Sequence, residues 1–248
     1  MKRTRSSGEL EFEVVDGVGS LGERAAGIIQ AELKRKPDLL LCASAGGTPT
    51  GTYGALARQA ARTPRQFGSL RILQIDEWAG LAPRHPATCD SDLRSKLLEP
   101  LQVSSDRYVG FKSHAADLDE ECARVSRWVA ESGPIDICIL GLGINGHIAM
   151  NEPGPVAVPY PHVARLATSS QHHALLKDLH PKPRYGMTLG MADILRSRKI
   201  LLLVSGAAKR LPLERLLQDL VTPQFPASFL WLHADATVLC DRAAAPNL

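Results

Sequence analysis

The amino-acid sequence predicts an α/β protein with a mostly parallel, Rossmann-like three-layer sheet that carries helices on both faces. Strand-like and helix-like segments alternate along the chain, as in parallel sheets whose strands are joined by crossover helices. The strand-like segments are mostly apolar, and Leu39–Ala43 is continuously so, which suits strands covered on both faces. The 248 residues, 44% of them hydrophobic and 22% charged, are enough for one large domain with a substantial core.

The elements follow one another in a regular order. The apolar runs expected to form strands are Leu10–Val15, Leu39–Ala43, Leu70–Ile75, Ile135–Leu140, Lys199–Val204 and Thr237–Cys240. The helix-like segments between them are Ser20–Lys36, about Pro49–Arg62, about Cys89–Leu98, Leu118–Glu131 and about Ala208–Leu220. The first helix is expected to begin with a capping box, because Ser20 and Glu23 have the required spacing.

The sequence contains no internal repeat and no low-complexity linker, so residues 9–248 are expected to form a single α/β domain. Residues 1–8 are basic and polar, and we expect them to be a flexible tail rather than a signal peptide. Residues 155–183 are the least regular part of the chain and are rich in Pro, His and Ser. They could form a mobile lid or a long surface connection, and the sequence leaves both open.

Composition narrows the class of protein. The net charge of +3 is spread along the chain, which gives no case for nucleic acid and suits a small anionic substrate. No apolar run approaches the ~20 residues of a membrane span. The five cysteines show no metal-binding spacing and no disulfide framework, which fits a reducing cytoplasm. The oligomeric state is not fixed by the sequence, and a homo-oligomer remains open.

The most informative segment is Gly141–Gly154 (GLGINGHIAMNEPG), which directly follows an expected buried strand. In parallel sheets, ligands bind just beyond the carboxyl ends of the strands. The first six residues also fit the G-x-G-x-x-G fingerprint of dinucleotide sites. That site needs a long helix after the third glycine, but Pro153 and Gly154 would stop a helix after about two turns. The dinucleotide interpretation therefore fails.

A histidine and a carboxylate in this loop suggest acid–base chemistry. His147 and Glu152 are five residues apart, so one helical or looped turn could bring the carboxylate to an imidazole nitrogen. A carboxylate-bound histidine has a defined tautomer, which suits a general acid or base. The alternative is a histidine satisfied by backbone groups in a tight turn. No His-x-x-x-His motif and no cysteine pair supports a zinc site, which would need three or four ligands.

Two further loops carry groups of the same kind. Gly46, Gly47 and Thr48 follow the strand Leu39–Ala43, with Thr48 as an expected N-cap and Pro49 at the first helical position. Glycines next to a helix N-terminus can bind a phosphate, although an ordinary capped turn would have the same sequence.

Asp76 and Glu77 follow the strand Leu70–Ile75. Neighbouring side chains on an extended segment point to opposite sides, so only one of the two carboxylates is expected to face a ligand. A solvated turn and a magnesium site held by this pair are the alternatives. An anion cradle, a carboxylate and an imidazole at one rim of a sheet would suit a phosphorylated small molecule that undergoes proton transfers.

Taken together, these loops resemble the glucosamine-6-phosphate deaminase/isomerase family, which shares its fold with 6-phosphogluconolactonases. The resemblance runs in the family's order from about Leu39 to Leu239. The segments that carry it are Ala45–Pro49 (AGGTP), Asp76–Leu81 (DEWAGL) with His85–Pro86, Gly141–Gly154, Arg184–Gly190 (RYGMTLG) and Ser205–Lys209 (SGAAK). The NEP sequence at the end of the long motif is typical of the deaminase branch.

The resemblance implies a role for each matching residue. Asp76 matches the group that moves a proton between C2 and C1 of an open-chain sugar. His147 matches the acid–base that opens the ring, and Glu152 matches the carboxylate that orients it. The residues that match phosphate ligands are Gly46, Gly47, Thr48 and Lys209. No metal or organic cofactor is expected, and the implied partner is a phosphosugar substrate.

Two departures from the family pattern bear on the substrate. Asn145, which we include in the candidate catalytic set, stands where the family usually has an aspartate. The galactosamine-6-phosphate deaminase/isomerase branch shares this asparagine, the Asp-Glu-Trp triplet, the Thr88–Cys89 pair and a segment like Ala227–His233 (ASFLWLH). The family's lid arginine has no counterpart between Arg165 and Arg184, and His173 or Lys177 could replace it.

The resemblance therefore predicts a deaminase/isomerase that converts a 2-amino-2-deoxyhexose 6-phosphate to a ketohexose 6-phosphate and ammonia. Galactosamine 6-phosphate is the preferred substrate, with glucosamine 6-phosphate as the other candidate. Two alternatives remain: a 6-phosphogluconolactonase-like hydrolase, and a non-catalytic sugar-phosphate sensor. Retention of Asp76, His147 and Glu152 argues against a sensor.

Overall fold

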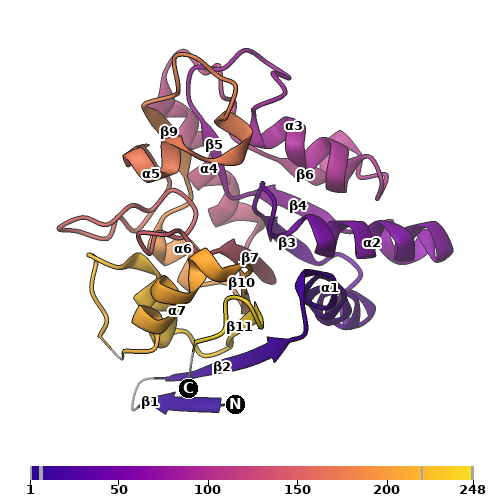
Figure 1. Cartoon of the computed structure of the whole chain (residues 1–248). Coiled ribbons are helices and arrows are strands. Elements are labelled where there is room, and N and C mark those ends of the chain that lie inside the picture. Colours follow the sequence, from indigo (N-terminus) through magenta and orange to yellow (C-terminus); the bar gives the residue numbers. More distant parts are fainter. Residues whose placement is uncertain (1, 6–7, 219, 247–248) are drawn as a thin grey trace.

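A central sheet, parallel except at one edge, forms the middle layer of the protein (Figure 1). The computed structural model describes residues 2–5, 8–218 and 220–246, with side chains from Leu10 onwards. The strands of this sheet lie in the order β1 (Lys2–Arg5), β2 (Gly8–Val15), β11 (Ala236–Asp241), β10 (Lys199–Val204), β7 (Ile137–Gly141), β3 (Leu40–Ala43), β4 (Arg71–Gln74) and β6 (Tyr108–Val109). Only β1 runs antiparallel to its neighbour within this sheet.

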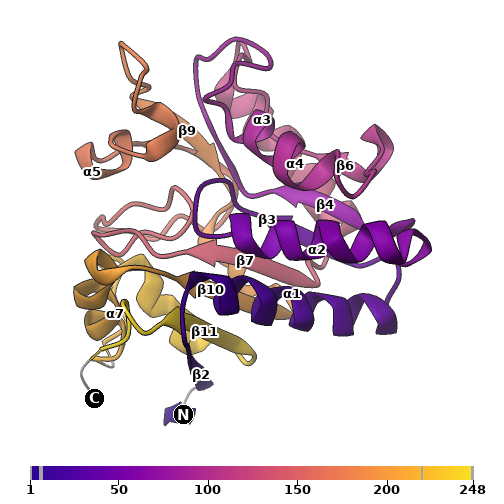
Figure 2. The ribbon, with the colours of Figure 1, turned by 45° about the vertical axis from the view of Figure 1, so that its right-hand side comes forward.

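Helices cover both faces of the sheet, and each face has its own apolar core. Successive residues of one strand belong to different cores: Leu41 packs on one face and Leu40 on the other. The first core is covered by α1 (Val18–Arg35), α2 (Thr50–Arg62) and the π-helical turn η2 (Arg94–Leu98), and Figure 2 shows α1 and α2 side by side. The second is covered by α4 (Leu118–Ser132), α6 (Met191–Leu195), α7 (Arg210–Leu216) and η6 (Pro226–Leu232). The predicted three-layer fold is confirmed.

A second, antiparallel sheet stands beside the carboxyl end of the first. Its strand order is β5 (Asp76–Trp78), β9 (Tyr185–Thr188) and β8 (His162–Arg165). The chain leaves the main sheet after β4 and pairs at once with β9, so that Asp76 lies opposite Thr188. A small apolar cluster that includes Trp78 and Met150 packs under this sheet. The sequence analysis did not predict this sheet, although it holds Asp76 in place.

Several helix boundaries differ from the prediction. The capping box at Ser20 is wrong, because α1 already begins at Val18 after Gly17, and Ser20 lies within its first turn. The helix expected to reach Leu220 ends at Leu216. The remaining short helical segments are η1 (Pro64–Phe67), α3 (Cys89–Leu93), η3 (Ser105–Arg107), α5 (Thr168–Gln171), η4 (Ala174–Leu176) and η5 (Ala207–Lys209).

The expectations for the termini and the irregular segment stay predictions. In the predicted tail, residues 1, 6 and 7 lie outside the described residues, whereas Lys2–Arg5 form β1. The segment 155–183 includes β8, α5 and η4. Among the described residues, none of the helices combines the length and the apolar character needed to cross a membrane.

Candidate active site

Side chains from four neighbouring chain segments line one cavity of about 290 Å³ at the carboxyl edge of the sheet. Thr48 follows β3, Asp76 begins β5 directly beyond β4, His147 follows β7, and Lys209 follows β10. The four strands β10, β7, β3 and β4 are adjacent in the sheet. Because parallel strands end at the same edge, residues far apart in the sequence meet there. The structure thus brings together the loops that the sequence analysis expected to converge.

Asp76 is a buried carboxylate at the wall of this cavity, with 9% of its surface exposed. Burial raises its pKa from 3.8 to about 7, because the charged form loses hydration, and the neighbouring charge of Glu77 adds to the effect. A hydrogen bond from the Cys89 thiol opposes the shift. A carboxyl group with a pKa near neutrality can both accept and return a proton.

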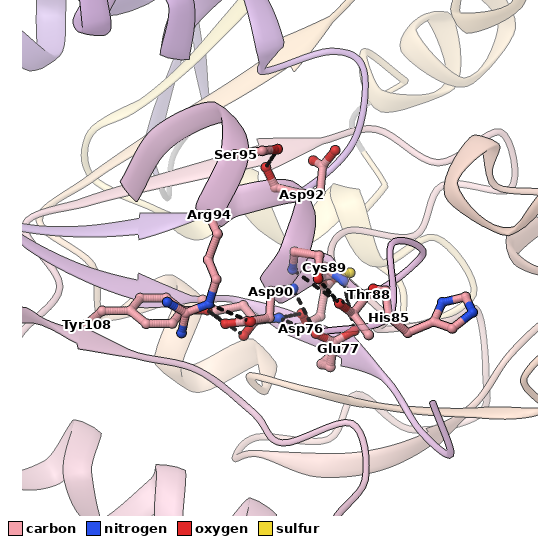
Figure 3. A network of polar contacts seen from close by, with 12 residues as sticks. Asp76, Glu77, His85, Thr88, Cys89, Asp90, Asp92, Arg94, Ser95 and Tyr108 are labelled. Atoms are coloured by element: carbon pink, nitrogen blue, oxygen red, sulfur yellow. Dashed lines mark hydrogen bonds and ion pairs between the residues drawn. The ribbon is translucent and has the colours of Figure 1, made fainter. Parts of the chain in front are cut away.

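Glu77 lines a different cavity from Asp76, and Figure 3 shows both residues within one network of polar contacts. Its side chain is fully buried and accepts four hydrogen bonds of 2.8–3.0 Å, from the backbone N–H groups of Trp78, Cys89 and Asp90 and from the side-chain amide of Gln74. Only Asp76 of the pair faces the cavity, as the alternation of side chains along a strand predicts. The two carboxylates line different cavities, which argues against a magnesium ion held by both.

The second candidate acid–base group is the His147 imidazole, which faces a carboxylate. His147 Nδ1 lies 3.5 Å from Glu152 Oε2 and 3.3 Å from Ser170 Oγ. The Ser170 hydroxyl also donates to Glu152. Burial raises the pKa of Glu152, but the hydrogen bonds from His147, Ser170 and Asn145 outweigh it and lower the pKa to about 2. Glu152 is therefore ionised at neutral pH and orients the histidine, leaving Nε2 for the cavity.

Asn145 holds the loop that carries His147. Its side-chain amide donates to Glu152 Oε2 at 2.8 Å, and its carbonyl oxygen accepts the backbone N–H of His147 at 3.1 Å. Neither Asn145 nor Glu152 lines the cavity itself. Both residues therefore orient the His147 imidazole without lining the cavity that the imidazole faces.

Two glycines of this loop are required by close packing. A Cβ atom at Gly143 would lie 2.4 Å from His147 Nδ1, so the imidazole can rest there only because no side chain is present. Gly146 has a φ of +89°, and a Cβ atom there would lie 2.1 Å from the Phe225 ring. The glycines thus fit a tight turn around the histidine rather than a dinucleotide site.

The expected phosphate loop has free backbone donors. Gly46 has a φ of +110°, and its N–H donates to Asp92, so this group is already used. Among the described residues, by contrast, the N–H groups of Gly47 and Thr48 have no hydrogen-bond acceptor. The expectation that Thr48 caps α2 is wrong. The helix begins at Thr50 after Pro49 without any side-chain cap, and Thr48 lines the cavity instead.

Two further nitrogen donors complete this end of the cavity. Lys209 Nζ donates to the carbonyl oxygen of Leu142 at 2.6 Å, and burial lowers its pKa. His173 lines the cavity next to Gly46 and packs against Trp78 with ring centroids 5.5 Å apart. Lys177 is 75% exposed, lies 3.8 Å from Asp178 and does not reach the cavity. Of the two candidates to replace a lid arginine, only His173 is in position.

Sequence reasoning missed several residues of the site. Ser169 and Ser170 of α5, and His172 directly after it, line the cavity, and all three lie in the irregular segment 155–183. Trp78 and Cys89 were quoted only as parts of a motif, yet they form the wall beside Asp76. No local pattern marked Ser170, because its contact with Glu152 depends on how this segment folds back over the loop.

Comparison with known proteins identifies the family. The family of glucosamine-6-phosphate isomerases/6-phosphogluconolactonase matches residues 16–239. Glucosamine-6-phosphate deaminase 1 of Bacillus subtilis (strain 168) is 36% identical over 227 residues, which are 91% of this chain and 94% of that protein. The Escherichia coli (strain K12) protein named putative deaminase AgaI is 36% identical over 224 residues, 90% of this chain and 89% of that protein. The chain belongs to this family of enzymes, and the resemblance found in the sequence is confirmed.

Solved structures agree with this assignment. A monomeric glucosamine-6-phosphate deaminase superposes with a TM-score of 0.88 at 33% identity, covering 94% of this chain and 98% of that one. The 6-phosphogluconolactonase from Trypanosoma brucei superposes with a TM-score of 0.78 at 21% identity, covering 94% and 97%. The second likeness shows the shared fold alone.

Proposed function

We propose that this enzyme converts a 2-amino-2-deoxyhexose 6-phosphate to the ketohexose 6-phosphate and ammonia. The observation that carries the proposal is that one cavity is lined by Asp76, His147, Lys209 and Thr48, and that the N–H groups of Thr48 and its neighbour Gly47 have no acceptor among the described residues. A phosphosugar needs an anion site at one end and acid–base groups at the other. The deaminases among the relatives support the same reaction.

The phosphate group binds first in this scheme. The N–H groups of Gly47 and Thr48 and the Thr48 hydroxyl donate to its oxygens, and the Lys209 ammonium supplies positive charge. His173 takes part through Nε2, because its Nδ1 already accepts the N–H of Leu175 at 3.2 Å. Burial lowers the pKa of His173, so a neutral ring with a single N–H donor is the form that binds.

Ring opening is assigned to His147. Opening a pyranose requires a proton on the ring oxygen and removal of the proton from the C1 hydroxyl, and a single imidazole can exchange both. Glu152 and Ser170 fix the orientation of the ring through Nδ1, so that Nε2 performs the exchange. Asn145 completes this support without itself carrying a proton.

Asp76 performs the isomerisation step. Its carboxylate removes the proton from C2 of the open-chain aldose and returns it to C1, while the C1 oxygen gains a proton to become a hydroxyl. The resulting imine at C2 reacts with water, which releases ammonia and leaves a ketone. These steps use only water and side chains of this chain, so the proposal invokes no metal or organic cofactor. A partly dry site favours the proton transfer because the carboxylate is poorly hydrated there.

Galactosamine 6-phosphate is the proposed preferred substrate. The preference rests on Asn145, on the Asp-Glu-Trp triplet that ends at Trp78, and on the Thr88–Cys89 pair, all of which resemble the galactosamine branch. Trp78 and Cys89 both line the cavity, so part of this resemblance lies in contact with the substrate space. Action in the cytoplasm and the oligomeric state stay predictions.

The experiment that tests the proposal is a substrate panel on the purified chain with ammonia as the readout. We expect ammonia from galactosamine 6-phosphate, a lower kcat/KM for glucosamine 6-phosphate, and no hydrolysis of 6-phosphogluconolactone. Lactone hydrolysis without ammonia release would replace the proposal by a lactonase. Binding of these phosphosugars without turnover would favour a sensor.

A matched pair of variants tests the phosphate end separately. His173→Ala should raise KM about tenfold, because a donor to a charged group is lost. Lys177→Ala should leave KM unchanged, since this exposed side chain lies outside the cavity. Equal effects of the two substitutions would remove His173 from the phosphate site.

A further inference from the structure

A second cavity, of about 340 Å³, lies on the other side of Glu77 from the candidate active site. It is bounded by the loop that follows β5, by α3, and by the segment between β6 and α4. None of its lining residues lines the first cavity. We call it the β6 groove.

The β6 groove has an excess of positive charge. Arg84 and Lys112 line it, and within the described part of the chain their side chains have no ion pair and no hydrogen bond. The two carboxylates that line the groove already accept hydrogen bonds from the protein. Asp90 accepts from Arg94 at 2.7 Å, and Glu77 is saturated by its four N–H donors. Arg94 pairs with Asp90 and Arg124 pairs with Glu121. The remaining charges in the groove are those of Arg84, Lys112 and Glu77, two positive and one negative. The concave site therefore keeps a net charge of +1, which would attract an anion.

Neighbouring side chains fix the position of the Arg94 guanidinium in the groove. Its Nε donates to Asp90, and its guanidinium stacks over the Tyr108 ring at 5.3 Å from the ring centroid. The Tyr108 hydroxyl in turn hydrogen-bonds Asp90 at 2.8 Å, so the three side chains fix one another, as Figure 3 shows. The terminal nitrogens of Arg94 donate to no described residue. A pre-organised guanidinium with free N–H groups matches the geometry of a phosphate.

We propose that the β6 groove is a second ligand site, which binds a small phosphate monoester through Arg84, Arg94 and Lys112. The three cations provide donors for the phosphate oxygens, and the net positive charge of the groove attracts the anion. The groove also offers hydroxyl and backbone groups around the guanidiniums, and its volume leaves room for a small polar body attached to the phosphate. This site does not depend on the reaction proposed for the first cavity.

Calorimetric titration of the full chain with glucitol 6-phosphate tests the proposal. This open-chain phosphate ester has no carbonyl group and no amine, so it can occupy both sites without turnover. The wild-type chain should bind two equivalents. The double variant Arg84→Ala/Lys112→Ala should lose one of them, with a Kd raised on the order of tenfold or more, because charge-assisted contacts are removed. Both side chains are exposed and unpartnered, so the fold should be unaffected, which a thermal melt checks.

The control is Lys34→Ala/Arg62→Ala, which removes the same charge from exposed positions on α1 and α2. It should still bind two equivalents. Titration with inorganic phosphate then shows whether the phosphate group alone suffices or whether its ester is needed, and either result supports the site. A groove variant that binds as many equivalents as the wild-type chain, with unaltered Kd, would overturn the proposal. If the wild-type chain binds a single equivalent, loss of that equivalent in the groove variant assigns it to the groove, and its retention overturns the proposal. Ammonia release, measured on the same samples, tests the proposed reaction independently of this count.

Discussion

Replacing Asp76 by asparagine should make the protein more stable above neutral pH. Asp76 is buried beside Glu77, and its folded-state pKa of about 7 lies above the ordinary value of 3.8. The folded state therefore binds the proton more tightly than the unfolded state does, and ionisation opposes folding. An asparagine at this position has the same shape and no charge to desolvate.

The size of the effect follows from these two pKa values. The interval from 3.8 to about 7, at about 1.4 kcal/mol per pH unit, corresponds to about 4 kcal/mol at most. The destabilisation by Asp76 is absent below about pH 4. It grows as the pH rises toward 7 and is constant above that. A buried carboxylate that destabilises the fold by this amount is expected at a functional site, because the reaction needs a group that lowers stability.

Urea unfolding of both proteins at pH 4, 6 and 8.5 measures the difference. The gain in unfolding free energy of Asp76→Asn over the wild type should be near zero at pH 4, intermediate at pH 6 and complete at pH 8.5. Asp178→Asn is the control: this side chain is 87% exposed, so water solvates its charge in both states and the difference should not vary with pH. An Asp76→Asn advantage that is the same at all three pH values would refute the burial argument.

Three further predictions concern the site. Gly146→Ala should lower the free energy of unfolding by about 1–3 kcal/mol, because the new methyl group would overlap the Phe225 ring and φ is positive. Gly19→Ala, at an exposed position in helix α1, should instead raise it by roughly 0.5–1 kcal/mol. Chemical denaturation of both variants measures this difference. The kcat/KM for the amino-sugar phosphate should fall about tenfold per pH unit below about pH 7, as Asp76 becomes protonated, and a pH-independent rate between 5 and 7 would contradict this. Ser170→Ala should lower kcat about tenfold with little change in KM, because it removes the hydroxyl that bridges the His147 imidazole and the Glu152 carboxylate. A change confined to KM would instead identify Ser170 as a substrate ligand.

The main sheet could be predicted because its strands are short, continuously apolar runs. Lys199–Val204 has the predicted bounds, and the ends of the other predicted strands differ by at most two residues. Two strands were not predicted: β6, which consists of two half-buried residues and has no such run, and β1, which lies in the segment expected to be a tail. The predicted meeting of the loops followed from topology alone, because parallel strands end at one edge.

The second sheet could not be predicted in the same way. Asp76–Trp78 is a three-residue strand with two acids, and its pairing with Gly186–Thr188 is set by contacts far apart in the sequence. The position of Ser170 depends on the same long-range packing. The predicted capping box at Ser20 is wrong for a local reason. Gly17 is the N-cap residue of α1, so the helix begins before Ser20.

The central claim is that Asp76 moves the proton between the two sugar carbons, and ammonia release by Asp76→Asn tests it most directly. The account predicts a loss of kcat on the order of 10²–10⁴-fold. The affinity for glucitol 6-phosphate should be unchanged, because Asp76 is not one of the groups proposed to bind the phosphate. Turnover within about threefold of the wild-type rate would contradict it.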